Sequence, residues 1–205
     1  MTDGVPTVFV VDDDPGVGDS IRLLLRSVGL PSKVFLSANE FLAAYNHEQA
    51  GCLVLDVRMP GMSGLDLQAR LQEMDSALPI IFVTAHGDVP MAVNAVKAGA
   101  VDFIQKPFRD QELLDKIQEA MEADARIRAQ RMDLAEIRGR LETLTPRETE
   151  VLGLVVAGKP NKNIARTLGI SQRTVEIHRA RVMEKMQVRS VSLLVQLVMK
   201  AKEKD

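Results

Sequence analysis

Side chains able to carry out phosphoryl chemistry stand at the ends of short apolar runs in the first half of the chain: Asp12-Asp13-Asp14, Asp56, Thr84 and Lys106. Neighbouring carboxylates without a partner repel one another and resist ionisation. A hard divalent cation removes that cost, and oxygen ligands with room for water and phosphate oxygens suit Mg²⁺. Asp56 is then placed as a nucleophile toward a phosphoryl donor. The metal and Lys106 would balance the charge of the phosphoryl oxygens, and Thr84 would donate a hydrogen bond.

The apolar runs that carry these residues are typical of buried parallel strands. Residues 8–11, 52–55 and 80–83 are continuous apolar runs, and 34–36 and 101–104 are weaker strand candidates. Helical patterns at 17–27, 65–74 and 91–98 lie between them. Strands that alternate with helices predict an α/β, doubly wound, five-stranded parallel sheet covered on both faces. In such a sheet the chemistry gathers at the carboxyl ends of the strands.

The motifs at these strand ends resemble those of a known family. Asp12-Asp13, Leu55-Asp56-Val57-Arg58-Met59-Pro60-Gly61, Thr84-Ala85 and Lys106-Pro107-Phe108 are similar, in order and spacing, to the motif set of response-regulator receiver domains. The resemblance implies a flavodoxin-like receiver over residues 1–122. It implies that Asp12, Asp13, Asp56 and the backbone carbonyl of Arg58 hold Mg²⁺. It also implies that a sensor histidine kinase phosphorylates Asp56, that Lys106 contacts the acyl phosphate, and that the Lys106–Pro107 bond is cis.

The same resemblance assigns a switch. Thr84 is expected to move toward the phosphoryl group while Phe103 changes rotamer, which remodels the face built from the helix after Thr84 and the strand that contains Phe103. Residues 86–93 and 97–103 also fit the FixJ-like pattern within the family. We therefore expect a homodimer when Asp56 is phosphorylated.

A helical segment follows the receiver. Residues 124–144 contain no proline, and only Gly139 interrupts the helix formers. Ile127, Leu134 and Leu141 recur every seven residues, which predicts a linker helix over 123–141 that packs on a partner. A solvated helix with incidental leucines is the alternative, because Gln130 and Gly139 interrupt the seam.

The remaining residues, 142–205, are predicted to form an all-α four-helix domain. Thr145-Pro146 supplies an N-cap and a proline at the first helical position. Two helices, 161–168 and 172–186, are joined by Gly169-Ile170-Ser171, which is the spacing of a helix-turn-helix. The strings Leu144-Thr145-Pro146-Arg147-Glu148-Thr149-Glu150-Val151-Leu152, Asn161-Lys162-Asn163-Ile164-Ala165 and Thr174-Val175-Glu176-Ile177-His178 resemble the DNA-binding domain of the LuxR/NarL/FixJ family.

A helical wheel separates the two faces of the second of these helices. Val175, Val182 and Met186 fall on the core side, with His178 as a packing residue. The expected DNA contacts, from the outward face and its surroundings, are Arg173, Glu176, Ile177, Ala180, Arg181, Lys162, Ser171, Thr174 and Lys185, with Arg166 and Arg179 as further phosphate contacts. An outward isoleucine suits a thymine methyl, an arginine suits guanine or phosphate, and a glutamate accepts from a cytosine amino group. A solvated surface role is the alternative for each lysine.

Charge separates the two halves in the same way. Residues 1–124 carry 9 Lys and Arg against 19 Asp and Glu, a net charge of −10, whereas residues 125–205 carry 17 against 9, a net charge of +8. Such asymmetry indicates two domains, the second of which faces a polyanion. The start of the chain lacks the pattern of a signal peptide, and no apolar stretch is long enough for a membrane helix. The single cysteine, Cys52, is expected to be a buried, reduced thiol in a cytoplasmic protein.

These observations predict a phosphorylation-switched transcription factor rather than an enzyme, whose receiver catalyses only its own phosphoryl transfer and dephosphorylation. Its partners would be a sensor histidine kinase, promoter DNA and RNA polymerase, with no membrane. Activation of nitrogen-fixation or microaerobic genes follows from the FixJ-like pattern. Two alternatives are a Mg²⁺-dependent phosphatase of the haloacid-dehalogenase type, suggested by the Asp-x-Asp spacing of Asp12 and Asp14, and an interaction adaptor that binds no DNA. The residues Pro15-Gly16 do not match the phosphatase motif.

Overall fold

The computed structural model describes residues 5–85 and 89–202 and divides into two compact units, Met1–Arg128 and Ala129–Asp205. The parts of the N-terminal expectation and of the FixJ-like pattern that fall on residues 1–4 and 86–88 lie outside the described residues.

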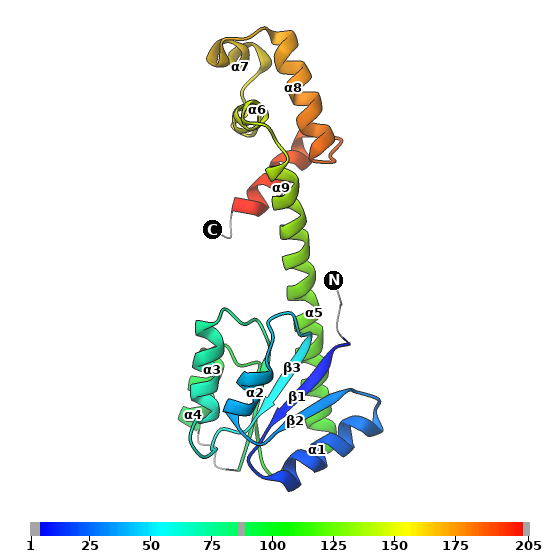
Figure 1. Ribbon diagram of the computed structural model, residues 1–205, viewed down its shortest axis with the longest axis vertical. Helices are drawn as coiled ribbons and strands as arrows, with labels where there is room; N and C mark the ends of the chain where they lie inside the picture. The colour runs from blue at the N-terminus through cyan, green and yellow to red at the C-terminus, as the bar shows by residue number, and fades with distance from the viewer. Residues whose placement is uncertain (1–4, 86–88, 203–205) are drawn as a thin grey trace. The chain divides into compact units, whose positions relative to one another are not determined.

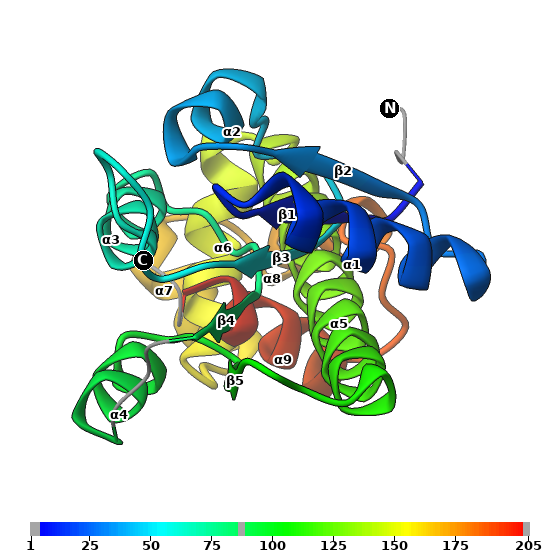
Figure 2. The ribbon, with the colours of Figure 1, turned by 90° about the horizontal axis from the view of Figure 1, so that it is seen from below.

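The first unit is built on a parallel sheet of five strands in the order β2-β1-β3-β4-β5; Figure 1 labels β1, β2 and β3, and Figure 2 labels all five. The strands are β1 (Thr7–Val11), β2 (Ser32–Phe35), β3 (Gly51–Leu55), β4 (Ile80–Thr84) and β5 (Asp102–Gln105). Every neighbouring pair is parallel. The order reverses between β1 and β3, so the carboxyl ends of these two strands form the switch point of a doubly wound sheet. The predicted α/β class is confirmed.

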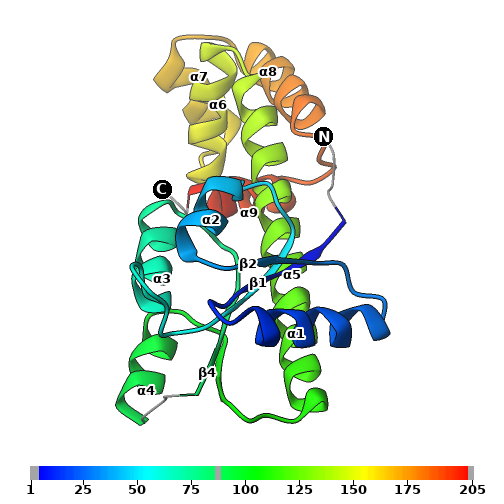
Figure 3. The same cartoon turned by 60° about the horizontal axis from the view of Figure 1, so that its bottom comes forward.

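Helices cover both faces of this sheet. They are α1 (Pro15–Ser27), α2 (Ala38–Ala44), α3 (Gly64–Glu73), α4 (Val89–Lys97) and the first part of α5 (Asp110–Glu142). Helices α1 and α5 lie on one face, and α2, α3 and α4 lie on the other (Figures 2 and 3). Because alternate residues of a strand point to opposite faces, Phe9 and Leu53 join the core under α2 and α3, whereas Val10 and Cys52 join the core under α1 and α5.

The lone cysteine is buried in β3, as expected from its apolar run. Burial, and after it the negative charge of Asp124, raises the pKa of the Cys52 thiol to about 12. The thiol is therefore protonated at neutral pH and is a core side chain.

Helix α5 is continuous over 33 residues and belongs to both units. Its residues up to Arg128 belong to the first unit, and those from Ala129 belong to the second. Helix α5 thus runs from the expected receiver, over 1–122, through the expected linker, over 123–141, to the first residue of the expected domain over 142–205, and this division stays a prediction. No proline occurs in α5, and its one glycine, Gly139, does not end it, while Leu134 and Ile137 are buried as part of the second unit. This segment is therefore not a solvated helix with incidental leucines.

The second unit adds four helices: α6 (Pro146–Val156), α7 (Asn161–Leu168), α8 (Gln172–Lys185) and α9 (Val191–Lys202). Thr145 caps α6 in a capping box with Glu148, and Ser171 caps α8 by accepting from the Thr174 N–H. Gly169 ends α7 in the left-handed region at φ 66°. The predicted caps and turn are thus confirmed, and they fix the angle between α7 and α8.

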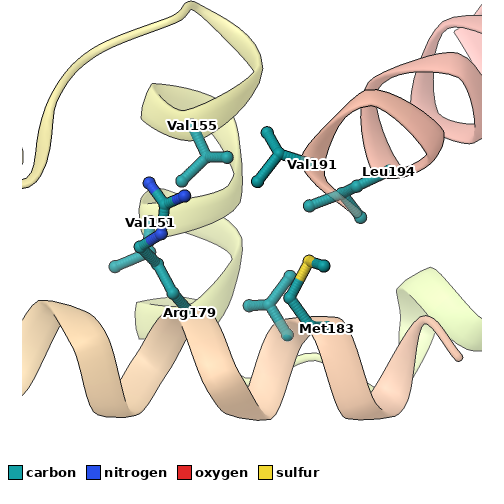
Figure 4. A pocket seen from close by; sticks show the side chains of 7 residues that line it. Val151, Val155, Arg179, Met183, Val191 and Leu194 are labelled. Carbon is teal, nitrogen blue, oxygen red and sulfur yellow. The ribbon is translucent and has the colours of Figure 1, made fainter. Parts of the chain in front are cut away.

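Three of these helices meet at a small apolar pocket (Figure 4). Figure 4 shows Val151 and Val155 of α6, Met183 of α8, and Val191 and Leu194 of α9 pointing toward one gap. Aliphatic side chains line it, with Arg179 at its edge. The gap belongs to the hydrophobic core of this unit, so α9 is held by packing within the domain. In the described part of the chain, no helix has the length and apolar character needed to cross a membrane.

An ion pair fastens the C-terminal end of α8 to the start of α6. The Lys185 Nζ donates to Glu148 Oε2 over 2.7 Å and to the Thr143 carbonyl over 2.9 Å. The hydrogen bond from Lys185, and then that from the Thr145 N–H, lowers the pKa of Glu148 to about 2. Glu148 is 2% exposed, so its charge depends on these partners.

We predict that Glu148→Gln destabilises the second unit by about 2 kcal/mol at pH 7, because a charge-assisted hydrogen bond to Lys185 is lost. The pKa of Glu148 is lower in the folded state, so its contribution is complete above pH 4.5 and disappears as the pH falls from about 4.5 to about 2. Urea unfolding followed by hydrogen exchange within α6–α9 should therefore show a difference between wild type and variant that shrinks over that range. Glu150→Gln, which removes the exposed pair with Arg147, is the control and should change little. A difference that persists unchanged to the acid end would contradict this role.

Candidate functional site

Two carboxylates and one ammonium meet at the carboxyl ends of three strands. Lys106, directly after β5, places its Nζ 2.6 Å from Asp12 Oδ2 and 3.0 Å from Asp56 Oδ1. Asp12 follows β1, Asp56 follows β3, and the two are 3% and 7% exposed. The strand order puts the ends of β1 and β3 side by side, and β5 ends at the same edge of the sheet beyond β4, from where the long Lys106 side chain reaches residues 94 and 50 positions away.

The electrostatics of this cluster is a balance between burial and pairing. Burial raises the pKa of Asp12, and the hydrogen bond from Lys106 opposes but does not cancel that effect. Burial alone would lower the pKa of Lys106, but its hydrogen bonds to Asp12 and Asp56 outweigh it and raise that pKa. Two ionised carboxylates against one ammonium leave one negative charge to be balanced. A cation, or the positive centre of a phosphoryl group, is therefore attracted to this point.

Backbone groups orient the two carboxylates. The Arg58 N–H donates to Asp56 Oδ2 over 2.7 Å, and the Asp14 N–H donates to Asp12 Oδ1 over 3.0 Å. One oxygen of each side chain thus faces Lys106 and the other faces a loop amide. Asp56 is held in one orientation with its Oδ1 on the Lys106 side, as a nucleophile at this position requires.

The loop after Asp56 packs tightly on α3. A Cβ atom added to Gly64 would lie 2.1 Å from the Asp56 carbonyl oxygen and 3.1 Å from the Leu55 side chain. The start of α3 can therefore approach the Asp56 backbone only with glycine at this position. The Gly64 N–H donates to the Val57 carbonyl over 2.9 Å, which closes the loop.

The donor set at this site suits Mg²⁺ in part. Asp12 and Asp56 are hard oxygen ligands drawn together on one ammonium, and their excess negative charge fits a divalent cation. Asp13 is exposed, and among the described residues no group of three or more acidic, histidine or cysteine side chains is arranged to hold a metal. The structure therefore brings together two of the three expected carboxylates. Receiver domains in general use Mg²⁺ for phosphorylation.

Asp14 has a different role from its neighbours. Its Oδ1 accepts from the Gly16 N–H over 2.8 Å and caps α1. This carboxylate is committed to the helix start, where it cannot serve as the second acid of an Asp-x-Asp phosphatase motif. Asp12 pairs instead with Lys106 and, through it, with Asp56.

The two expected switch residues lie on neighbouring strands. Thr84 ends β4 and is 1% exposed, and Phe103 in β5 is half-buried. The ring of Phe103 packs at a centroid distance of 6.4 Å from Phe82, its partner in the β4–β5 register. The Lys106–Pro107 peptide is cis.

The outward face of α8 presents the expected side chains. Arg173, Glu176, Ala180 and Arg181 are exposed, and Ile177 is 47% exposed. Val175, Val182 and Met186 are buried, so the helical wheel assigned the two faces correctly. An isoleucine left this exposed on a helix that is otherwise polar on that side is suited to an apolar contact with a ligand.

Other expected DNA contacts have varied surroundings. Lys162 and Arg166 are exposed on α7. Ser171 and Thr174 share a hydrogen bond of 2.8 Å at the start of α8, and Arg179 is half-buried. The ammonium of Lys185 is occupied by Glu148 and the Thr143 carbonyl. Of this set, Lys185 therefore has a structural partner that a phosphate would have to displace.

His178 lies between the two faces of α8. It is half-buried, and its Nδ1 is buried with no hydrogen-bond partner among the described residues. This position agrees with a packing role for the ring.

Sequence reasoning did not single out Asp124, a third buried carboxylate in the first unit beside Asp12 and Asp56. Asp124 is 5% exposed and accepts from the Gly51 N–H and from Arg128. One signal in the sequence could have identified it. Asp124 lies four residues after the fully buried Ala120, and therefore on the same side of α5.

Comparisons with known proteins match both units. A family model for the "Response regulator receiver domain" matches residues 8–118, and one for "Bacterial regulatory proteins, luxR family" matches residues 142–199. Response regulator protein TodT of Pseudomonas putida is 44% identical over 203 residues, covering 99% of this chain and 89% of TodT. Transcriptional regulatory protein FixJ of Rhizobium meliloti (strain 1021) is 48% identical over 193 residues, covering 94% and 95%. The solved structure of response regulator StyR gives a TM-score of 0.88 at 48% identity, covering 96% of this chain and all of that one. These relatives are named as regulators.

We predict that Gly64→Ala destabilises the first unit by about 2 kcal/mol, because the new Cβ must displace the Asp56 carbonyl. Calorimetry should show a lowered unfolding transition for that unit. Gly139→Ala is the matched control, since nothing lies within 4 Å of its Cβ. Placed inside α5, it should stabilise by about 0.5 kcal/mol. Equal transitions in Gly64→Ala and wild type would show that the loop tolerates the methyl group.

Proposed function

Because this chain is a DNA-binding two-component response regulator of the LuxR/FixJ type, we propose that it is phosphorylated on Asp56 and that this modification controls its binding to promoter DNA. The observation that carries the proposal is the single ammonium of Lys106 between the Asp12 and Asp56 carboxylates. It marks one point where an anionic nucleophile, a cation and a phosphoryl group can meet.

The proposed phosphoryl transfer is a displacement at phosphorus. An oxygen of Asp56 forms a bond to the phosphorus of a sensor kinase phosphohistidine, and the phosphorus–nitrogen bond breaks. The electron pair of that bond stays with the imidazole. The transferred group carries its charge on three oxygens, so catalysis is mainly positioning and charge compensation. Lys106, already within 3.0 Å of Asp56, supplies one compensating charge.

Asp12, Asp13, Asp56 and the backbone carbonyl of Arg58 would hold Mg²⁺, which when bound supplies the remaining charge compensation. Asp13 is exposed next to Asp12 and can turn toward the site without leaving a core. Lys106 and the cation then share the negative charge that the two buried carboxylates bring.

We further propose that Thr84 and Phe103 carry the change to the surface. The Thr84 hydroxyl donates to the phosphoryl group, and the half-buried Phe103 ring changes rotamer. Exposed valines lie on α4 and directly before β5: Val93 and Val96 are 43% and 48% exposed, and Val101 is 36% exposed. Pairing of two such faces removes these side chains from water, which accounts for a homodimer in the phosphorylated state.

The second unit is proposed to bind DNA through α8. Ile177 would contact a thymine methyl, Arg173 a guanine or a phosphate, and Glu176 a cytosine amino group. Ala180, Arg181, Lys162, Ser171 and Thr174 would complete the contact surface, mostly at the backbone. Lys185 already donates to Glu148 and to the Thr143 carbonyl, so a phosphate would have to displace these partners. The net charge of +8 on residues 125–205 gives this half its salt-dependent attraction to DNA.

The remaining parts of the proposal concern partners and targets. Promoter-bound dimers would contact RNA polymerase and activate transcription, in the cytoplasm where promoter DNA lies. Nitrogen-fixation or microaerobic genes are the targets that follow from similarity to FixJ.

Wild-type protein incubated with acetyl phosphate and a magnesium salt is expected to gain one phosphoryl group, measured by intact mass, and Asp56→Asn none. Asp115→Asn, which changes an exposed carboxylate on α5, should behave as wild type. Chelation of the metal should abolish the gain. A phosphoryl group on Asp56→Asn would place the acceptor elsewhere.

Arg173→Ala and Ile177→Ala are expected to weaken operator binding, because each removes a proposed base-edge contact. Loss of Ile177 should relax discrimination at one base pair by about 1 kcal/mol. Binding titrations against single-base operator variants measure both effects. Lys33→Ala removes the same charge from the first unit and serves as the control. Unchanged selectivity in both α8 variants would exclude this recognition face.

A further inference from the structure

An ion pair between the buried Asp124 and the half-buried Arg128 ties α5 to the segment that leads into β3. Asp124 Oδ2 accepts from the Gly51 N–H over 2.9 Å and from the Arg128 Nε over 3.0 Å. The Arg128 Nη2 donates to the Glu48 carbonyl over 2.9 Å. We call Asp124 and Arg128, with these two backbone partners, the α5 anchor. It lies at the start of the strand whose other end carries Asp56.

The α5 anchor adds polar contacts to the apolar packing at the end of the first unit. Leu113, Ile117 and Ala120 are fully buried against the sheet, and Asp124 and Arg128 continue the same side of α5 in steps of four residues. Between residues 121 and 128, Asp124 is the one side chain classed as buried. The last turns of α5 on this unit are therefore positioned in part by these two polar side chains, beside the half-buried Ile127.

The backbone around Gly51 restricts the geometry of its hydrogen bond to Asp124. Gly51 is buried, and a Cβ there would lie 1.8 Å from the Thr7 carbonyl oxygen, so the chain has no room to shift. Its buried N–H would cost about 1–3 kcal/mol without an acceptor. The Asp124 carboxylate reaches it only at one rotation of α5 about its axis. The effect of the Asp124 charge on the nearby Cys52 thiol agrees with its position beside β3.

No buried side chain fixes α5 immediately beyond the anchor. Residues 129–133 are all exposed, and Met132 is 61% exposed. The next buried positions, Leu134 and Ile137, belong to the second unit. A turn of helix without packing is only marginally stable by itself. The α5 anchor is therefore the last fixed point of the linker on the phosphorylated unit.

We propose that the α5 anchor is a positioning device that couples the phosphorylation state of Asp56 to DNA binding, by holding the linker at one rotation where it leaves the receiver. This inference rests on the proposed function. A partly buried ion pair contributes little net stability, because desolvation and solvent screening offset its attraction, but its bonds favour one geometry. Without the anchor, paired receivers still tether two DNA-binding units. The effective concentration of the second unit near DNA, once the first is bound, is therefore kept. The last turns of α5 on the receiver then fray, and part of the phosphorylation-dependent gain in DNA affinity is lost.

The test compares full-length Arg128→Ala with Arg126→Ala. Both remove an arginine from the same helix, but Arg126 is exposed and lies 4.0 Å from Glu122 in a surface pair. For each variant, phosphoryl incorporation, hydrogen exchange of residues 121–132 and DNA affinity with and without acetyl phosphate and Mg²⁺ are measured. Arg128→Ala should accept phosphate as wild type does, exchange faster, and lose about fivefold of the phosphorylation-dependent gain in affinity. Arg126→Ala should match wild type in all three.

A second variant distinguishes loss of the anchor from misfolding of Arg128→Ala. Arg128→Lys keeps the charge, but one ammonium cannot replace the separate bonds from Nε and Nη2, so its gain in affinity should lie between those of wild type and Arg128→Ala. An undiminished gain in Arg128→Ala, or an equal loss in Arg126→Ala, would overturn the inference and leave the proposed function standing. Absence of any gain in wild type would overturn the proposed function itself, and the inference with it.

Discussion

The ammonium of Lys106 between two buried carboxylates is the interaction on which the arrangement of the first unit depends. Asp12 and Asp56 would repel each other at the ends of adjacent strands if nothing positive lay between them. Lys106 reaches both because β5 brings it to the same edge of the sheet. The pairing is incomplete in charge, since one ammonium faces two carboxylates. The same arrangement that permits folding therefore leaves an attraction for a cation and a phosphoryl group.

Much of this could be predicted from the sequence, because the decisive signals are local. Four-residue apolar runs bounded by turn residues specify buried strands, and polar residues directly after them must lie at the carboxyl edge. The two faces of α8 could be predicted from the helical period of 100° per residue. It assigned Val175 and Val182 to the core and Ile177 to the surface, as the structure has them. The capping residues Thr145 and Ser171 were recognisable because their role needs only neighbours three positions away.

The remaining features depend on contacts distant in the sequence. Asp124 is one of many acidic residues on α5 until its bond to Gly51, 73 residues away, is known. Lys185 resembles the other basic residues of the second half, and only the fold pairs it with Glu148, 37 positions earlier. The division of α5 between two units has the same origin. Helix propensity continues through the boundary, while tertiary packing decides which residues belong to which unit.

The central claim is that one modified carboxylate governs DNA affinity. Its most direct test is the equilibrium affinity for a promoter duplex over a range of salt concentrations, with and without acetyl phosphate and Mg²⁺, for wild type and Asp56→Asn. The account predicts tighter, salt-sensitive binding in phosphorylated wild type alone, with Asp56→Asn unresponsive. Affinity that is the same in all four samples would contradict it, and would describe a DNA-binding protein whose receiver serves another purpose.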